Sequence, residues 1–331
     1  MALFTPSASP SVTVKEIDLT GVVPNVQTST GAFVGNFGWG PVGVATLVSD
    51  ENGLVTAFSA PTDDNTVDFH SAAYFLRYSN SLQLVREQDS DARNSIAKNT
   101  FSSAAVQAIN NLDAFENATI DSSDGAFIAK YPGKLGDSLQ VSICGVSDSD
   151  NGGTNNFNSW TYKSEFDAAP GTSKFASDLG CKNDELHVIV VDQDGDITGV
   201  AGTVLERFPF LSVAKNGDGT SNYYKDVLKV SSSWIYAGGF HRNSDSDGAN
   251  DFSGPQWGND ATLAGSQDFK GDVTFGTGTN QWSFDGGVTS ASLGTDDVLR
   301  GFDKFEDKDN IEVDFLIAPQ SLTNTAANTV V

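Results

Sequence analysis

The sequence predicts a mixed α/β (α+β) protein with several layers and more than one domain. Near both ends, at 31–85 and 293–317, apolar strand-like runs alternate with short amphipathic helices. The residues between them are rich in loops and in β-prone runs. With 331 residues, of which 38% are hydrophobic, the chain can form about two domains with real cores.

The charge and cysteine content exclude several classes of protein. The formal net charge of −24 should repel nucleic acids and anionic membranes. Two cysteines, Cys144 and Cys181, do not make a disulfide scaffold and fit a reducing cytoplasm. The first residues lack the features of a signal peptide, and no apolar run approaches the roughly 20 residues of a membrane helix.

The N-terminal segment predicts an extended arm. Apolar and polar residues alternate over one strand-like run, made of Val12, Thr13, Val14, Lys15, Glu16, Ile17, Asp18 and Leu19. A mostly polar linker, 20–30, follows it. An isolated strand on a tether must find a sheet edge, either in its own domain or in another subunit.

The stretch 28–44 is the one around which the chain is organised. It predicts a strand over Gly31–Phe37, in which Gly35 marks a bulge or a close approach of another backbone. Pro41 ends this strand, since proline cannot sit in a central strand. A second strand is expected over Val42–Val48.

Two helices and a strand complete this first region. Ser49 is expected to cap a short helix that stops before Pro61. A second helix over 66–78 places apolar residues on one face, and a strand begins at 82–85. The order strand, helix, helix, strand indicates an α/β layer.

The middle of the chain predicts strands separated by turns. After a helical patch at 103–115, two strands flank Tyr131-Pro132-Gly133 within 127–143. The β-prone run 185–191 is followed by Asp194-Gly195, a hairpin turn signal, and a return strand at 197–207.

The last third predicts fewer elements. A helix opens at 221–228 and a strand follows at 233–236, whereas 240–287 is expected to form long surface loops. Thr295 is expected to cap a helix, and 311–317 to form a buried strand.

No residue pattern predicts catalysis or a metal site. The three histidines, His70, His187 and His241, lie far apart and without metal-ligand spacing, so structural roles are expected. Cys144 lies in a predicted strand and is expected in the core. Gly133-Lys134 is not a P-loop, because the residue after the lysine is a leucine.

Two acidic loops contain candidate calcium ligands. The run 192–196 departs from the EF-hand pattern and indicates a hairpin turn. The loop 244–251, with Asp245, Asp247 and Asp251, could attract a hard cation, but a solvated loop is the preferred interpretation.

Four ordered motifs carry a resemblance to a known family. They are GAFVGNFGWGP at 31–41, YPGKLG at 131–136, SNYYKDVL followed by SSWIY at 221–236, and a glycine pair leading to a helix and strand at 286–317. Together they resemble the contractile tail sheath proteins of myoviruses, especially T-even-like phages. The motif residues singled out are Gly38, Trp39, Gly40, Pro41, Tyr131, Pro132 and Gly133.

The resemblance implies a structural subunit and not an enzyme. Such subunits stack as hexameric rings around a tail tube and contract to drive the tube through the host envelope. The implied partners are other sheath subunits, the tube protein, and the baseplate and tail terminator proteins, with no cofactor, nucleic acid or membrane. The implied location is the virion, after assembly in the host cytoplasm. The alternative, suggested by the acidity and the Asp-rich loops, is an extracellular calcium-binding or adhesin-like β protein.

The α/β pattern of the two end segments and the β- and loop-rich middle predict a domain layout. Residues 1–23 form the arm, 24–87 and 288–331 form a discontinuous core, and 88–287 form an inserted β-rich domain. The large outward domain that T-even-type sheaths insert near 86–124 is expected to be absent. Sheath proteins continue well beyond the strand at 311–317, so a truncated form, a fragment and a part encoded elsewhere stay open.

Overall fold

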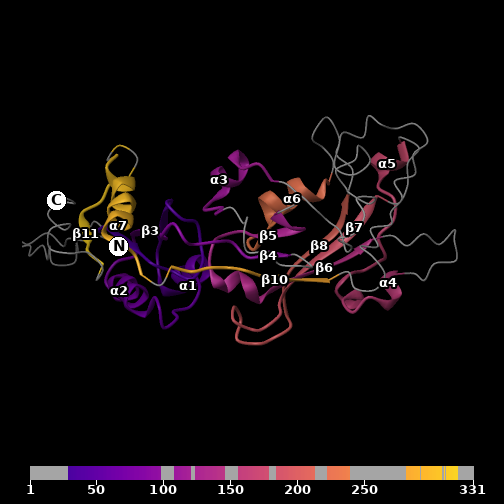
Figure 1. Ribbon diagram of the computed structural model, residues 1–331, viewed down its shortest axis with the longest axis horizontal. Coiled ribbons are helices and arrows are strands. Elements are labelled where there is room, and N and C mark those ends of the chain that lie inside the picture. Colours follow the sequence, from indigo (N-terminus) through magenta and orange to yellow (C-terminus); the bar gives the residue numbers. More distant parts are fainter. Residues whose placement is uncertain are drawn as a thin grey trace, which may run out of the picture.

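The computed structural model is elongated, with a four-stranded sheet at one end and a seven-stranded sheet at the other (Figure 1). It describes residues 29–97, 108–120, 124–145, 156–178, 184–212, 222–238, 281–290, 292–307, 309 and 311–319.

The four-stranded sheet is mixed and has the order β11-β1-β3-β2. Its central strand β1 (Gly31–Gly35) runs parallel to β3 (Leu82–Arg86) and to β11 (Phe315–Ile317). The edge strand β2 (Ala45–Val48) is antiparallel to β3. Segments separated by more than 200 residues therefore share one sheet.

Helices cover both faces of this sheet (Figure 1). Two of them, α1 (Glu51–Phe58) and α2 (Thr66–Leu76), form a core with Phe33 of β1. On the other face α7 (Thr295–Phe302) packs on Val34. Because β1 is covered on both sides, all five of its residues are buried, as expected for an apolar strand at the centre of three layers.

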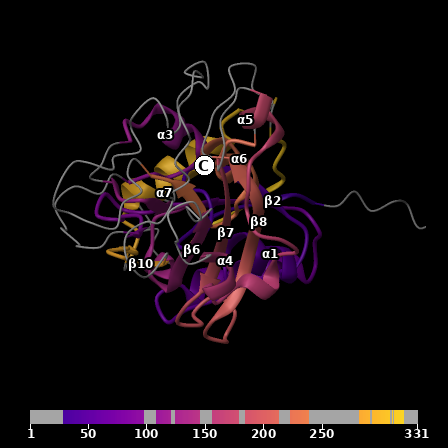
Figure 2. The ribbon, with the colours of Figure 1, turned by 90° about the vertical axis from the view of Figure 1, so that its right-hand side faces the viewer.

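The seven-stranded sheet is entirely antiparallel, in the order β8-β7-β6-β10-β4-β5-β9. Its strands are β4 (Ile96–Ala97), β5 (Phe127–Ala129), β6 (Leu139–Gly145), β7 (Glu185–Asp192), β8 (Thr203–Ser212), β9 (Ile235–Ala237) and β10 (Gln281–Asp285). Four helices accompany them, α3 (Leu112–Asn117), α4 (Asn156–Ser159), α5 (Lys174–Asp178) and α6 (Tyr224–Ser231). Figure 2 looks onto this end, where β6, β7 and β8 lie side by side.

Several predicted elements are confirmed with shifted starts. The cap of α1 is Asp50 instead of Ser49, because the Asp50 carboxylate accepts a hydrogen bond from the Gly53 N–H at 2.7 Å. Gly294, and not Thr295, is the N-cap of α7. Residues 42–44 form a turn, with Gly43 at φ 70°, so β2 begins only at Ala45.

Other predictions hold only in part. The described part of the helix expected at 103–115 is non-helical up to Asn111, whose side chain caps the short helix α3 instead. The return strand expected at 197–207 is β8, which starts six residues later because the turn is longer than a two-residue hairpin. The expected loop 240–287 contains β10, and the last strand, β11, is short and largely exposed.

Candidate functional site

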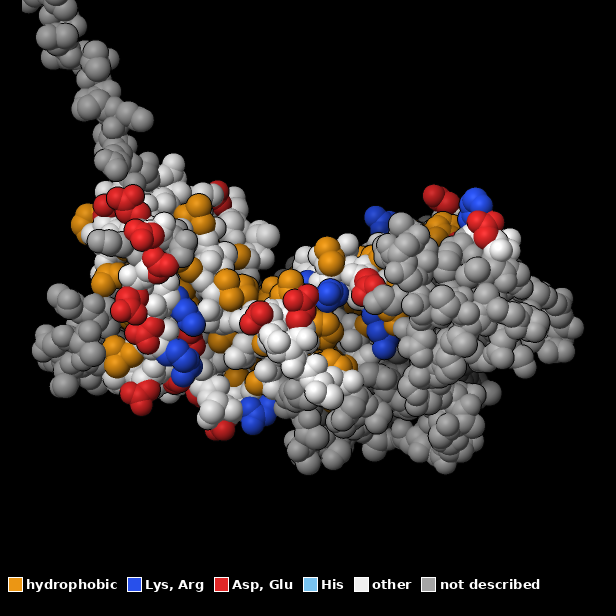
Figure 3. All heavy atoms as spheres, turned by 90° about the horizontal axis from the view of Figure 1, so that it is seen from above, with side chains coloured by type: hydrophobic (Ala, Val, Ile, Leu, Met, Phe, Trp, Pro, Cys, Tyr) orange, Lys and Arg blue, Asp and Glu red, His pale blue; other side chains and the backbone are white. Residues whose placement is uncertain are grey.

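The two sheets are joined where the chain crosses between them. Residues 87–95 leave the four-stranded sheet and 286–294 return to it. Halfway across, Arg93 and Val288 exchange both backbone hydrogen bonds, with N···O distances of 3.1 and 3.0 Å. Seen from above, the outline dips between the two ends, and carboxylates are prominent on the described surface of the four-stranded end (Figure 3). We treat this junction as the candidate functional site.

Arg86 fastens three backbone segments at the junction. It is the last residue of β3 and is fully buried. Its Nε donates to the Phe37 carbonyl (2.8 Å), its Nη1 to the Gly40 carbonyl (2.6 Å) and its Nη2 to the Pro132 carbonyl (2.6 Å). Burial lowers the pKa of Arg86 to about 9, so the guanidinium remains charged at neutral pH. The side chain thus ties turns from both ends of the molecule to one strand.

The predicted motif residues meet at the same place. Trp39 leaves the first region and enters the core of the seven-stranded sheet, with ring centroids 5.3 Å from Tyr131 and 4.9 Å from Trp234. Gly133 has φ 137°, and a Cβ there would lie 3.1 Å from the Gly38 carbonyl oxygen. The turns Gly38–Pro41 and Tyr131–Gly133 are therefore packed directly against each other.

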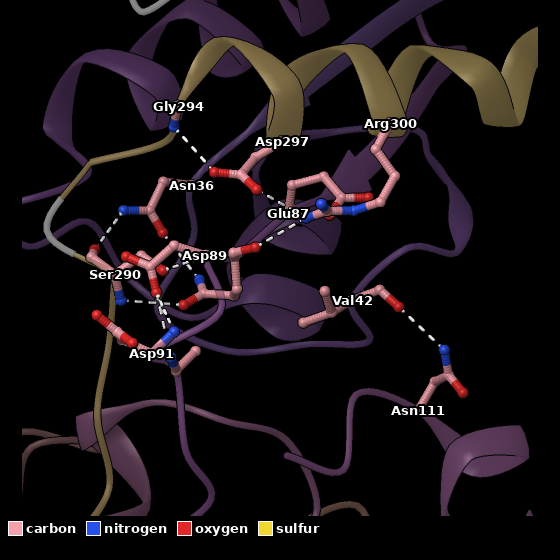
Figure 4. Close-up of polar contacts among 12 residues, drawn as sticks. Asn36, Val42, Glu87, Asp89, Asp91, Asn111, Ser290, Gly294, Asp297 and Arg300 are labelled. Atoms are coloured by element: carbon pink, nitrogen blue, oxygen red, sulfur yellow. Dashed lines mark hydrogen bonds and ion pairs between the residues drawn. The ribbon is translucent and has the colours of Figure 1, made fainter.

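A ring of amide hydrogen bonds ties the returning segment to the outgoing one (Figure 4). Gln88 Nε2 donates to Asn36 Oδ1 at 2.9 Å, and Gln88 Oε1 accepts from the Ser290 N–H at 3.1 Å. The Asn36 side chain closes the ring by donating to the Ser290 carbonyl at 2.8 Å. Asn36, Gln88 and Ser290 are all buried, so these bonds satisfy polar groups that would be costly to leave unpaired.

An ion pair fixes α7 to the outgoing segment. Arg300 points from α7 toward the buried Glu87 and donates to its Oε2 from Nε (3.2 Å) and Nη2 (2.9 Å) (Figure 4). Arg300 also reaches Asp297 at 3.0 Å. Burial raises the pKa of Glu87, while the hydrogen bonds from Arg300 act in the opposite direction.

A third connection comes from the segment before α3. The Val42 N–H donates to the Asn110 carbonyl at 2.9 Å, and the Asn111 side chain donates to the Val42 carbonyl at 3.0 Å. The junction therefore combines a buried cation, an aromatic contact, an amide ring and an ion pair. This arrangement can hold two sheets at a fixed angle, and its residues are not arranged for nucleophilic or acid–base chemistry.

His187 has a structural role within the seven-stranded sheet. It is buried, its ring stacks on Phe166 at 4.5 Å, and its Nε2 lies 2.8 Å from the Ala168 carbonyl. Its Nδ1 accepts the Phe210 N–H at 3.0 Å, so the ring is neutral with its proton on Nε2. Burial lowers the pKa of His187 accordingly.

The other titratable candidates do not form a reactive site. His70 is exposed on α2, and burial raises the pKa of Cys144 to about 12, which suppresses its thiolate. Within the described ranges, no three His, Cys, Asp or Glu side chains could together hold a metal ion.

The acidic turn after β7 is a closed loop. The Asp192 carboxylate accepts from the Ser138 hydroxyl at 2.6 Å, from the Gly195 N–H at 3.0 Å, and from Thr198 through both its N–H and its hydroxyl at 2.7 Å. These hydrogen bonds lower the pKa of Asp192 even though burial opposes them. Because this loop is longer than a two-residue turn, β8 begins later than the sequence predicts.

Several sequence candidates lie outside the described residues. They are the arm Val12–Leu19, Cys181, His241 and the loop acids Asp245, Asp247 and Asp251. Conversely, the sequence analysis missed Arg86. The available signal was an arginine that ends the apolar run LQLV, where a charge can be buried only if other segments supply acceptors.

Comparisons with known proteins give consistent similarities. No family model matches the chain. It is 35% identical over 205 residues to the tail sheath protein of Salmonella phage ViI, covering 62% of this chain and 29% of that protein. It is 41% identical over 88 residues to the tail sheath protein of Enterobacteria phage T4, covering 26% and 13% of the two chains.

Alignment with solved structures gives low similarity scores. The sheath tail protein from Listeria innocua has 10% sequence identity and a TM-score of 0.44, over 91% of this chain and 43% of that one. The alignments thus span less than half the length of the relatives. Among the described residues, no helix is long and apolar enough to cross a membrane.

Proposed function

Since the chain belongs to the phage tail sheath protein family, we propose that it is a structural subunit of a contractile phage tail sheath. In this role it stacks in hexameric rings around the tail tube and contracts to drive the tube through the host envelope. The observation that carries the proposal is the 35% identity over 205 residues to a tail sheath protein. The alternative, a calcium-binding or adhesin-like protein, gains no support from the described residues, which contain no group of side chains that could hold a metal ion.

The proposed domain layout has a discontinuous core. Residues 24–87 and 288–331 form the core domain, 88–287 form an inserted domain, and 1–23 form the arm. The pairing of β1 with β11 and the two crossing segments at the junction support this division. The chain leaves the core after β3 and re-enters it before α7, as expected for a domain inserted between two elements of another domain.

The arm Val12–Leu19 is proposed to add as a strand to the sheet of a neighbouring subunit. Among the described residues, no strand pairs with the outer edge of β2 or β11. Both edge strands expose apolar side chains, with Leu47 61% and Phe315 54% exposed. Strand addition relies on main-chain hydrogen bonds, so the link can survive a rotation of the subunits.

The proposed partners follow from this role. They are other sheath subunits, the tail tube protein, and the baseplate and tail terminator proteins, in the virion after assembly in the host cytoplasm. No cofactor or nucleic acid takes part, which suits the net charge of −24. The work of contraction comes from the difference between two packings of the same subunits.

Electron microscopy of the purified whole protein tests this function. We expect stacked rings or tubes with six-fold symmetry, whereas isolated particles at every concentration and salt condition would contradict the proposal.

The arm is tested by deleting residues 1–20. The deletion should leave the melting temperature of the monomer nearly unchanged and abolish stacking. Unfolding of the monomer would show that the arm belongs to its own core.

A further inference from the structure

The junction contains a polar cavity of about 490 Å³. Its walls come from the turn before β2, the outgoing segment, the segment before α3, and α7 with the turn after it. Residues that the argument uses are Gly43, Glu87, Asp89, Asp297, Arg300 and Lys304. The cavity thus opens between elements that belong to different sheets.

One wall carries a buried acceptor that lacks a donor. Glu87 Oε2 is held by Arg300, whereas Glu87 Oε1 is buried and has no hydrogen-bond partner among the described residues. Leaving such an oxygen unpaired is unfavourable, because it has lost water without gaining a replacement. Beside it, a methyl group on Gly43 would lie 3.7 Å from Oε1 and 3.9 Å from Lys304 Cε. There is therefore room at the wall next to the unpaired oxygen.

The charges around the cavity select the kind of ligand. Three carboxylates line it, those of Glu87, Asp89 and Asp297, against two basic side chains. The Arg300 guanidinium is already engaged by Glu87, Asp297 and the Gln88 carbonyl. An anion would face the carboxylates. A metal ion is disfavoured because the described residues offer no group of three ligating side chains.

We propose that this cavity binds an ammonium or guanidinium group, which donates an N–H to Glu87 Oε1. The group can belong to a free amine or to a lysine or arginine side chain of a second copy of the chain. The walls of the cavity belong to one chain, so the proposal does not rest on the sheath role.

Amide NMR spectra of the whole chain, titrated with n-butylammonium, test the proposal. We expect saturable shifts centred on Gly43 and Glu87, and none with butyrate or n-butanol at the same concentrations. Glu87→Gln should weaken binding about tenfold or more, since it removes the charge that faces the ligand. The matched control Glu116→Gln changes a carboxylate that pairs with Lys229 elsewhere and should bind as the wild type does.

A second variant keeps the test decisive if Glu87→Gln does not fold. Lys304 is exposed, and Lys304→Met removes a competing positive charge, so it should tighten binding of n-butylammonium by about two- to fivefold. Absence of saturable binding, equal binding of butyrate, or unchanged affinity in the folded variants would overturn the proposal.

The source of the group is distinguished in the same spectra. Shifts at Gly43 and Glu87 that grow with protein concentration, and that n-butylammonium reverses, identify a second copy as the donor. Shifts that arise only on adding n-butylammonium identify a free amine. Either result can occur whether or not the protein forms rings, so the outcome is separate from that of the microscopy.

Discussion

The edge strands of the two sheets differ in whether a further strand can pair with them. The seven-stranded sheet ends in β8, which carries Pro209 and a bulge with Phe210 at φ 50°, and in β9, which is fully buried. Proline and bulges are features that block further strand pairing. The four-stranded sheet instead ends in β2 and β11, whose apolar side chains are exposed. The comparison indicates that the seven-stranded sheet is complete in itself, whereas the four-stranded sheet leaves edges to which a further strand can add.

The junction makes the two sheets depend on each other despite this difference. Arg86 and Trp39 belong to the first region but have partners in the second. The predictions below separate what each region contributes from what the junction contributes, beginning with the largest expected effect.

Replacing Arg86 by methionine should destabilise the whole chain. The Phe37, Gly40 and Pro132 carbonyls would lose their donor, and an unpaired buried acceptor costs about 1–3 kcal/mol, so we expect a loss of roughly 4 kcal/mol. Urea unfolding followed by tryptophan fluorescence should split into two transitions. The control Arg93→Met removes bonds to nearby carbonyls only and should cost less than about 1 kcal/mol. Equal losses in the two variants would argue against the clamp.

Replacing Gly301 by alanine should destabilise only the four-stranded region. A Cβ there would lie 2.4 Å from Val34 Cγ1 and 2.9 Å from Glu87 Cγ, so α7 must move away at a cost of about 1–3 kcal/mol. The control Gly53→Ala lies in α1, where the nearest atom would be 3.6 Å away, and should stabilise by about 0.5 kcal/mol. Thermal unfolding measures both, and a stabilising Gly301→Ala would contradict the close packing of α7 on β1.

Replacing His187 by glutamine should affect only the seven-stranded region. The Phe210 N–H would lose its acceptor, at a cost of about 1–2 kcal/mol, whereas His70→Gln on the exposed face of α2 should change stability by less than about 0.5 kcal/mol. Neither change should alter the zinc content found by elemental analysis. A zinc signal lost on one of these changes would refute the structural role.

The stability of the wild type should also depend on pH through His187. Burial holds its pKa in the folded state below the ordinary 6.5, so the unfolded state binds more protons below that pH. The contribution of neutral His187 to the free energy of unfolding is therefore complete above pH 6.5 and is lost as the pH falls toward the folded-state pKa. Urea midpoints measured between pH 7.5 and 5 should fall less steeply in His187→Gln than in His70→Gln. Parallel curves would contradict the neutral histidine.

Charges placed on the open sheet edge should have the smallest effect on stability. Leu47→Lys is expected to change the free energy of unfolding by less than about 0.5 kcal/mol, because the side chain is 61% exposed. It should nevertheless reduce ring stacking in electron micrographs, since lysine protects an edge from strand addition. Val230→Lys on α6, at 75% exposure, serves as the control. Normal ring stacking of the Leu47→Lys variant would show that the arm does not add to the edge of β2.

The elements predicted best are those whose own residues carry a clear pattern of apolar and polar side chains. The apolar runs of β1, β3 and β7 and the helices α2 and α6 were predicted because their own residues carry the pattern. By contrast, β10 was missed although Trp282 and Phe284 alternate with exposed residues. Its partners in β6 lie about 140 residues away, within a stretch otherwise rich in Gly, Asp and Ser.

The junction was predicted only in part. The two motif turns were selected by resemblance, but nothing in the sequence placed them in contact with each other. Arg86 was missed because its three acceptors are backbone carbonyls, which leave no trace in residue identity. Likewise, Asp192 was considered as a calcium ligand, and only the structure supplies the backbone N–H groups that occupy it.

The most direct test of the central claim, that the junction holds the two sheets as one body, is a distance measurement between them. Spin labels at Val67→Cys in α2 and Val230→Cys in α6 sit on exposed positions of the two regions, with Cys181→Ser as background and Cys144 protected by burial. Pulsed dipolar spectroscopy should give one narrow distance distribution, which Arg86→Met broadens and Arg93→Met does not. A broad distribution in the wild type, or a narrow one in a folded Arg86→Met variant, would contradict it.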